Sequence, residues 1–412
     1  MESEQAQSSG SKAIAFDFYD PAFQNDPHGK YLEMLEKCPF HREPDLGWHA
    51  VFRHADIMDI VRDNEQFSVR HGPGTTYADA DTVPVLVGAD PPLHTKQKKA
   101  LAPAFNPTLI EALREPIREF AAARLDAMAR LETCDLMEEL ADQVPMFVIC
   151  RLLDLPFEDY PRLREWVDVL AGATLQKGQT MEADRIEKVG LMMQYFLPRI
   201  EAKIALDEAG ENPGEDMIAL LVKGRIDGER IPTAQILGFA QFLLVAGAAT
   251  TTVFIGSFFN LMIDHPEQWQ KLKDNPALLD TALEETLRIE SPVHGLFRTN
   301  RCPMELGGTP IPADTKIGLM WFAGNLDPAV FENPLAFDIA REPKVLRKHL
   351  SFGHGLHTCI GGPLARMEGK VVVEEFMKRF DGLERAGPEV PYPYPTLNGP
   401  YKLPVRLIAK QA

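Results

Sequence analysis

The chain has 412 residues, 45% of them hydrophobic and 25% charged, and these fractions exclude the disordered, collagen-like and low-complexity classes of protein. The length is sufficient for a core that encloses a large cofactor. The formal net charge of −17 at pH 7 argues against a nucleic acid or an anionic membrane as a partner, because such a surface repels phosphate groups.

The cysteines form neither a disulfide framework nor a zinc-binding pattern. They are Cys38, Cys134, Cys150, Cys302 and Cys359. Their number is odd, they are far apart and no Cys-x-x-Cys occurs, which favours a reducing compartment. Residues 1–18 lack the basic and apolar regions of a signal peptide, so we predict a cytoplasmic protein.

Hydrophobic periodicity predicts a mainly α-helical protein with a minor β portion. In chain order we expect a short strand at residues 48–52, a helix at 55–64, a long loop at 75–92, helices in 94–130 and much of 138–206, an acidic connection at 207–216, two strands around turns in 304–321, and a proline-rich irregular segment at 386–404. Apolar residues in the 75–92 loop are typical of a loop that covers a site.

Residues 236–263 carry no charge and are long enough to span a bilayer. Their middle contains polar Gln241 and Thr250, and no cluster of lysine or arginine flanks them. A helix that is apolar all round is also typical of the centre of a large protein. We therefore predict a buried central helix and no membrane span.

The segment 352–362, FGHGLHTCIGG, is the strongest candidate for a functional site. Gly353 and Gly361 allow a sharp turn and close approach to a flat group. Cys359 stands just before an expected helix, where N–H groups favour a thiolate, and His357 can donate to an anion. The residue types alone are equally compatible with a glycine-rich turn that buries a small hydrophobic cysteine.

The pattern Phe-Gly-x-Gly-x-His-x-Cys-x-Gly resembles the haem-binding loop of the cytochromes P450, the haem-thiolate monooxygenases. The resemblance implies a single cytochrome P450 domain over residues 1–412 and haem b as the cofactor; within that range residues 1–12, which are polar and small, are expected to be disordered. It also implies that Cys359 is the axial iron ligand, whose electron donation favours O–O cleavage. Phe352 would pack beside the loop, Gly353 and Gly361 would shape it, and His357 would reach a haem propionate.

Two further segments are similar to the same family. Glu285-Thr-Leu-Arg288 matches its Glu-x-x-Arg helix, and Arg341 matches the third residue that pairs with it. The implied role is structural, since glutamate and arginine three residues apart share a helix face. Leu326 occupies a position where arginine is commoner in the family, and nothing explains this change.

Three basic residues match positions that contact the haem carboxylates in the family. His94 and Arg298 match a histidine and an arginine, whereas Lys98 replaces the arginine of a His-x-x-x-Arg pattern. Lysine still offers a point charge to a carboxylate, without the planar fork of arginine. The alternative for each is a solvated basic residue.

The central helix carries the oxygen-binding residues that the resemblance implies. Small Ala246 and Gly247 would leave room for dioxygen beside the iron, and Thr250 would stabilise it. Ala249 stands where the family has an acid that helps to deliver protons, which puts the usual route in doubt. Water, Thr251 or a substrate hydroxyl remain as alternative proton sources.

The resemblance implies a monooxygenase that uses O₂ and the electrons of a separate [2Fe–2S] ferredoxin and its reductase to hydroxylate a small terpenoid, aromatic or alkyl compound. The expected substrate pocket comprises Tyr77, Val85, Leu86, Leu244, Val245, Ala248, Val293, Leu296 and Leu397. Basic residues expected at the ferredoxin interface are Lys96, Lys98, Lys99, Lys344, Arg347 and Lys348. A peroxide-driven oxygenase and a non-enzymatic haem sensor are the alternatives, although residues 236–263 lack the arginine of peroxide-driven relatives.

Overall fold

Helices dominate the computed structural model, which describes residues 16–78, 83–171 and 183–410; the predicted disorder of residues 1–12 lies outside this part. The α-helices are α1 (Pro21–Asn25), α2 (Pro27–Lys37), α3 (His54–Arg62), α4 (Leu93–Leu101), α5 (Pro107–Ala112), α6 (Arg114–Met128), α7 (Gln143–Leu153), α8 (Tyr160–Ala171), α9 (Ala183–Glu208), α10 (Met217–Lys223), α11 (Thr233–Asp264), α12 (Pro266–Asp274), α13 (Leu279–Ile289), α14 (Trp321–Asn325), α15 (Pro343–Leu346) and α16 (Gly362–Arg379). Shorter helical turns are η1 (Leu86–Gly88), η2 (Ala102–Phe105), η3 (Met137–Ala141), η4 (Phe157–Asp159), η5 (Pro276–Leu278) and η6 (Gly355–His357).

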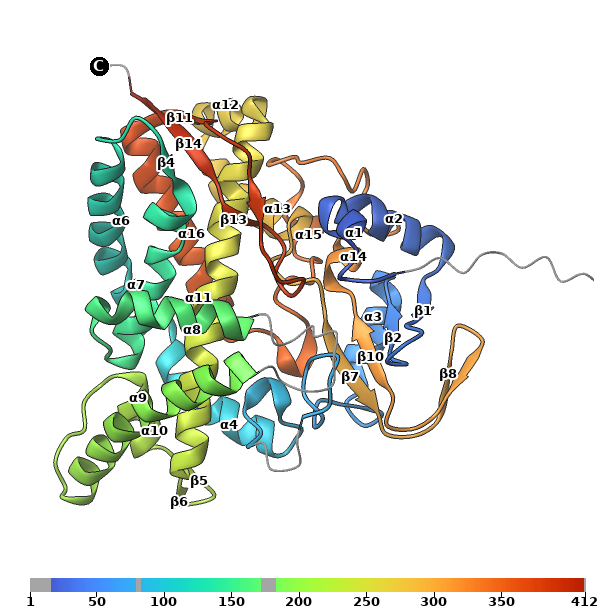
Figure 1. The fold of residues 1–412 in the computed structure, drawn as a ribbon, viewed down its shortest axis with the longest axis vertical. Coiled ribbons are helices and arrows are strands. Elements are labelled where there is room, and N and C mark those ends of the chain that lie inside the picture. The colour runs from blue at the N-terminus through green and yellow to red at the C-terminus, as the bar shows by residue number, and fades with distance from the viewer. Residues whose placement is uncertain (1–15, 79–82, 172–182, 411–412) are drawn as a thin grey trace, which may run out of the picture.

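The β portion is small, as predicted. Its strands are β1 (Phe40–Arg42), β2 (His49–Val51), β3 (Phe67–Ser68), β4 (Cys134–Asp135), β5 (Arg225–Ile226), β6 (Glu229–Arg230), β7 (Leu296–Asn300), β8 (Met304–Leu306), β9 (Thr309–Ile311), β10 (Lys316–Leu319), β11 (Phe380–Arg385), β12 (Val390–Pro391), β13 (Pro400–Lys402) and β14 (Pro404–Ala409). The largest sheet has the order β1-β2-β10-β7-β3, and β11-β14-β4 form a second one. In Figure 1 the first sheet lies on the opposite side of the molecule from most helices.

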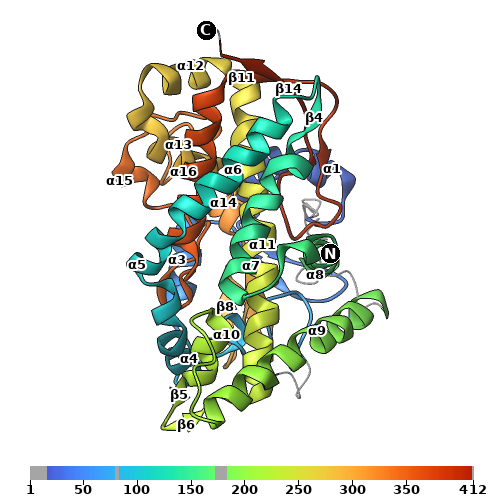
Figure 2. The same cartoon turned by 90° about the vertical axis from the view of Figure 1, so that its left-hand side faces the viewer.

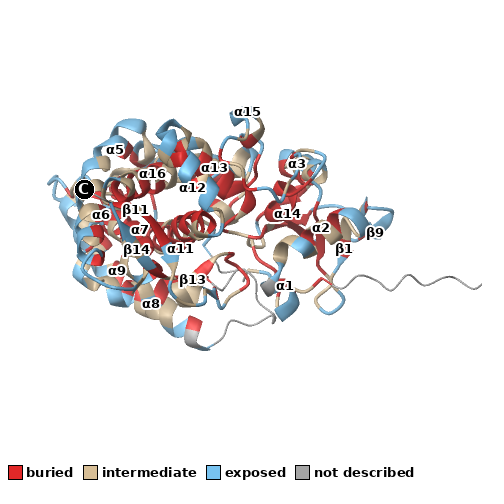
Figure 3. Ribbon diagram, turned by 90° about the horizontal axis from the view of Figure 1, so that it is seen from above, coloured by how far each residue is buried: buried red, intermediate tan, exposed pale blue. Residues whose placement is uncertain are grey.

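Helix α11 passes through the centre of the helical part (Figure 1, yellow; Figure 2) and contacts α7, α8, α9, α13 and α16. Its fully buried side chains include Phe239, Phe254, Phe258 and Phe259, and Figure 3 shows it among buried segments. Among the described residues it is the one helix long and apolar enough to cross a membrane, but 72% of its apolar window is buried inside the protein. The prediction of a buried central helix is therefore confirmed.

The expected pair of strands in residues 304–321 was wrong, because three strands form there. Gly307 and Gly308, with φ values of +57° and +81°, turn the chain between β8 and β9. A third left-handed residue, Asp314 (φ +58°), then directs the chain into β10, which pairs with β2 and β7 in the largest sheet. Residues 386–404 are mostly irregular as expected, except for the short pair β12 and β13.

The turn between η6 and α16, which carries Cys359, lies where several elements meet. Helix α3 contacts η6, while α11 and α13 contact α16. Ile360, the residue after Cys359, packs in the same apolar cluster as Ala248 and Ala249 of α11. The middle of the central helix and the cysteine turn are thus held together by the core.

Candidate active site

Glycines shape the turn that carries Cys359. Gly353 and Gly355 have φ values of +64° and +70°, a region that favours glycine. A Cβ at Gly355 would lie 3.2 Å from the carbonyl oxygen of Val61, so the close approach of α3 also requires glycine. The Cys359 N–H donates to the Phe352 carbonyl at 2.9 Å and closes the turn.

The Cys359 side chain is accessible to solvent. Burial of the surrounding site raises the pKa of its thiol, although the N–H groups of Gly361 and Gly362 and the charges of Arg366 and Lys98 act in the opposite direction and offset part of this increase. Donors at the start of α16 therefore point at the sulfur, an arrangement that stabilises an anionic sulfur.

Three residues that were predicted to contact the haem carboxylates come together beside this turn: His94, His357 and Arg298. The rings of His94 and His357 have centroids 4.2 Å apart. Burial, followed by the charges of Arg298, His94 and Lys98, lowers the pKa of His357 to about 3, and burial lowers that of Arg298 to about 10. Nδ1 of His94 is buried without a hydrogen-bond partner among the described residues. At neutral pH the two imidazoles are therefore uncharged hydrogen-bond donors, and the Arg298 guanidinium supplies the positive charge that favours an anion here.

Lys98 follows His94 by one turn of α4, but its ammonium group has a different target. It donates to the carbonyl oxygen of Leu356 at 2.9 Å and to that of Thr358 at 3.2 Å. The structure therefore joins Lys98 to the backbone of the cysteine turn, whereas its expected contact with a haem carboxylate stays a prediction.

Phe352 packs beside the turn as predicted, and a charged pair that sequence reasoning missed holds it there. The Arg366 guanidinium lies 4.3 Å from the centroid of the Phe352 ring and donates to Glu284 at 2.9 Å. His349 Nε2 lies 2.9 Å from the same carboxylate. Although burial raises the pKa of Glu284, the His349 and Arg366 hydrogen bonds lower it to about 2. The start of α16 is thus anchored to α13.

The structure brings Glu285, Arg288 and Arg341 together, as the sequence predicted. Arg288 donates twice to the Glu285 carboxylate at 2.7 Å, and Arg341 Nε lies 3.0 Å from it. Arg288 also donates to the carbonyl oxygens of Pro334 (2.8 Å) and Asn325 (3.1 Å). Because Glu285 and Arg288 are fully buried, this cluster fixes the segment before the cysteine turn and is not open to a substrate.

On α11 the hydroxyl of Thr250 donates to the carbonyl oxygen of Ala246 at 2.9 Å. The two residues are one turn apart, so they share a helix face, and both are half-buried. Ala249 and Thr251 are buried, at 5% and 4% exposure, and point in other directions. Among the three predicted catalytic positions, Thr250 alone combines an accessible surface with a hydroxyl group.

Gly247 faces α7 and not the Thr250 side of the helix. A Cβ there would lie 3.2 Å from the Ile149 side chain, so glycine at this position permits close packing of α7 against α11. Phe242, which sequence reasoning missed, precedes Ala246 by four residues and is half-buried on the face of Thr250. The i, i+4, i+8 spacing of Phe242, Ala246 and Thr250 was the signal that could have identified it.

Most of the expected pocket residues gather in one apolar cluster. They are Val85, Leu86, Leu244, Val245, Ala248, Val293 and Leu397. Val293 and Leu397 form a β-bridge, and Val85 lies 3.1 Å from the Cβ position of Gly238 on α11. Leu296 packs in a different cluster. Tyr77 is 52% exposed and donates its hydroxyl to the Asp314 carbonyl at 2.7 Å, so the structure does not bring it to this group.

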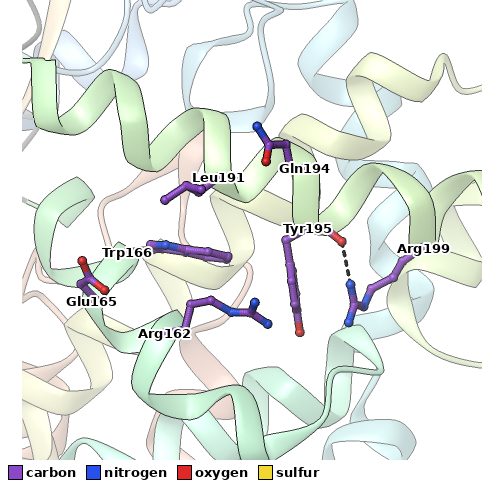
Figure 4. Close-up of a pocket in the computed structure, with 7 residues that line it drawn as sticks. All are labelled: Arg162, Glu165, Trp166, Leu191, Gln194, Tyr195 and Arg199. Atoms are coloured by element: carbon purple, nitrogen blue, oxygen red, sulfur yellow. Dashed lines mark hydrogen bonds between the residues drawn. The ribbon is translucent and has the colours of Figure 1, made fainter.

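A separate surface pocket of about 420 Å³ lies between α8 and α9 (Figure 4). The guanidinium groups of Arg162 and Arg199 lie 4.6 and 3.8 Å from the centroid of the Tyr195 ring, next to Trp166. Asp159 pairs with Arg162 at 2.7 Å and accepts the Tyr195 hydroxyl at 2.6 Å, which compensates much of the positive charge. None of the predicted site residues lines this pocket.

Comparison with known proteins agrees with this geometry. The family model for cytochrome P450 matches residues 164–397. The chain is 32% identical to erythromycin C-12 hydroxylase of Saccharopolyspora erythraea over 85% of its length and 86% of the relative. It is 33% identical to the cytochrome P450 monooxygenase PikC of Streptomyces venezuelae over 93% and 92% of the two chains.

Solved structures agree as well. The structure of cytochrome P450 CYP109Q5 from Chondromyces apiculatus matches with a TM-score of 0.83 and 29% identity, covering 96% of this chain and 99% of that one. The chain therefore belongs to the cytochrome P450 family and is a monooxygenase of that family.

Proposed function

We propose that the protein binds haem b through Cys359 and hydroxylates a small apolar compound, a terpenoid, aromatic or alkyl molecule. The observation that carries this proposal is the accessible Cys359 thiol in a glycine turn, with the N–H groups of Gly361 and Gly362 directed at its sulfur. Hydroxylases and an epoxidase among the relatives support oxygen insertion as the reaction.

The residues around the turn fit a haem. A flat group with two carboxylates requires one soft ligand and buried donors at its edge. His94, His357 and Arg298 supply those donors, and the buried Nδ1 of His94 lacks a partner among the described residues. These three side chains would hold the carboxylates, while Gly353 and Gly361 keep Cβ atoms away from the ring.

The haem-thiolate group, when bound, would supply the activation of O₂ for transfer of one oxygen atom to the substrate. The residues of the chain would stabilise an anionic Cys359 sulfur and hold or transfer protons. Because the Thr250 hydroxyl proton is donated to the Ala246 carbonyl, Oγ1 of Thr250 is free to accept a hydrogen bond on its accessible side. Ala249 cannot carry a proton, so water or a substrate hydroxyl that donates to Thr250 Oγ1 would replace the acid of other family members.

The surroundings of the turn support a proposal for the substrate and for the electron partners. The apolar cluster that includes Val85, Val245 and Val293 supports an apolar substrate. We propose a [2Fe–2S] ferredoxin with its reductase as the electron source and the cytoplasm as the location. Exposed Lys99, Lys344, Arg347 and Lys348 remain candidates for the ferredoxin interface, whereas Lys96 pairs with Asp227 and Lys98 binds the cysteine turn.

Substitution of the proposed ligand tests this function. Reduced wild-type protein under carbon monoxide is expected to show the strongly red-shifted Soret band of a thiolate adduct, and Cys359→Ser is expected to lose it. Cys150→Ser is the matched control, because Cys150 is buried in the core between α7 and its neighbours. A red-shifted band that persists in Cys359→Ser would refute the proposal.

A further inference from the structure

The peptide bond between Thr358 and Cys359 is held at both of its polar atoms. Its carbonyl oxygen, that of Thr358, accepts from Lys98 Nζ at 3.2 Å. Its N–H, that of Cys359, donates to the Phe352 carbonyl at 2.9 Å. Because a peptide is planar, fixing both polar atoms fixes the plane in which the Cα atom of Cys359 lies and so restricts where its side chain starts.

Lys98 also holds the other end of the same short segment. Its ammonium group donates to the Leu356 carbonyl at 2.9 Å, so a single side chain joins two carbonyl oxygens that are two residues apart. The segment otherwise depends on Gly353 and Gly355, whose backbone freedom makes such a turn pliable. An ammonium with three donors suits two divergent carbonyls, whereas a planar guanidinium suits one carboxylate.

Two lysines of α4, Lys96 and Lys98, have different partners. The Lys96 ammonium group is paired with Asp227, whereas the Lys98 ammonium group is directed at the backbone carbonyls of the cysteine turn.

We propose that Lys98 is a positioning residue for Cys359, which fixes the ligand turn through the Leu356 and Thr358 carbonyls and does not serve as an anchor for a haem carboxylate. The inference rests on the proposed role of Cys359 as the haem ligand. It assigns to this lysine a function different from the one that its replacement of the family's arginine implies.

The first test compares Lys98→Met with Lys99→Met in the holoprotein. Both variants remove one positive charge from α4. The Lys99 side chain is exposed, whereas the half-buried Lys98 side chain contacts the cysteine turn. We measure the rate at which the red-shifted carbon monoxide band decays in mild denaturant, and hydrogen exchange of the amides in residues 353–361. Lys98→Met is expected to speed the decay about tenfold, the scale of a lost charge-assisted hydrogen bond, and to speed exchange, while Lys99→Met matches the wild type.

The second test removes the carboxylate charges of the haem and leaves the protein unchanged. Wild type and Lys98→Met are reconstituted with haem dimethyl ester, which has no carboxylate charge. The effect of Lys98→Met on band decay is expected to be the same with the ester as with haem b. An effect that disappears with the ester would show that Lys98 acts on a propionate and would overturn the inference.

The remaining outcomes are separable. If the wild type has the red-shifted band and the band of Lys98→Met decays as slowly as that of Lys99→Met, the proposed role of Lys98 is overturned, but the role of Cys359 is not. A wild type without the band refutes the proposed function itself. If Lys98→Met yields no holoprotein, Lys98→Gln is compared with Lys99→Gln. The glutamine at position 98 keeps one donor group but no charge, so the band of Lys98→Gln is expected to decay faster than that of Lys99→Gln. Equal decay rates again overturn the inference.

Discussion

Glu368, on the face of α16 that enters the core, is a buried carboxyl group with only 3% exposure and an Oε2 atom that lacks a partner among the described residues. Burial raises its pKa from 4.5 to about 8. The folded protein therefore keeps this proton while the unfolded chain releases it, so stability falls as the pH rises from 4.5 towards 8 and the loss is complete above 8.

Glu368→Gln removes this titration while it keeps the size of the side chain. We expect the melting temperature of the variant, relative to the wild type, to increase between pH 6 and pH 9, as measured by circular dichroism. Glu305→Gln, at an exposed position on β8, should show no such trend. A difference between Glu368→Gln and wild type that is constant over this range would contradict the assigned ionisation.

At the scale of single residues the sequence predicted which side chains gather but not always what they contact. His94, Arg298 and His357 converge as the family motif implied. The target of Lys98 could not be predicted, because the carbonyls it binds are about 260 positions away in the chain and are selected by the path of the turn. The missing acid at Ala249 was visible in the sequence, since it is a change of residue type at one known position.

At the scale of elements, the cluster of Glu285, Arg288 and Arg341 connects α13 to the segment before the cysteine turn. Glu285→Gln leaves two guanidinium groups without a carboxylate, one of them fully buried, and is expected to cost about 3–5 kcal/mol in the free energy of unfolding. The variant should accumulate little haem-loaded protein, as determined by haem content and urea unfolding.

The surface pair of Lys271 and Asp338 is the control for that variant. Its atoms lie 3.0 Å apart, but both side chains are more than 40% exposed. Asp338→Asn is expected to cost less than about 1 kcal/mol, because exposed ion pairs contribute little. If Glu285→Gln unfolds at the same urea concentration as Asp338→Asn, the cluster does not have the structural role assigned to it.

The sequence predicted elements with long apolar patterns more accurately than it predicted short strands. The central helix was expected at residues 236–263 and forms as Thr233–Asp264. The strands in residues 304–321 were undercounted because two consecutive turns, at Gly307–Gly308 and Asp314, occur within a few residues. Pairing of β10 with β2 and β7 depends on chain segments that local patterns do not describe.

At the scale of the whole molecule, the net charge of −17 opposes association with an acidic protein. Exposed Lys344, Arg347 and Lys348 lie on and just after α15, which contacts α13. His54 on α3, the helix that also contacts η6, binds the Lys348 carbonyl at 2.9 Å. These contacts join the basic segment at α15 to elements that pack around the cysteine turn, and we propose that an acidic ferredoxin approaches there.

The double variant Arg347→Glu, Lys348→Glu tests that surface. Reversal of two charges should slow reduction of the protein by an acidic [2Fe–2S] ferredoxin at low salt and flatten the dependence of the rate on ionic strength, because steering between opposite charges is screened by salt. Rates are measured by stopped-flow spectroscopy at several salt concentrations. Lys402→Glu, Lys410→Glu changes the net charge equally at two exposed residues, one in β13 and one just after β14, and should reduce the rate much less. Equal slowing by both double variants would mean that overall charge, and not the surface at α15, governs the encounter.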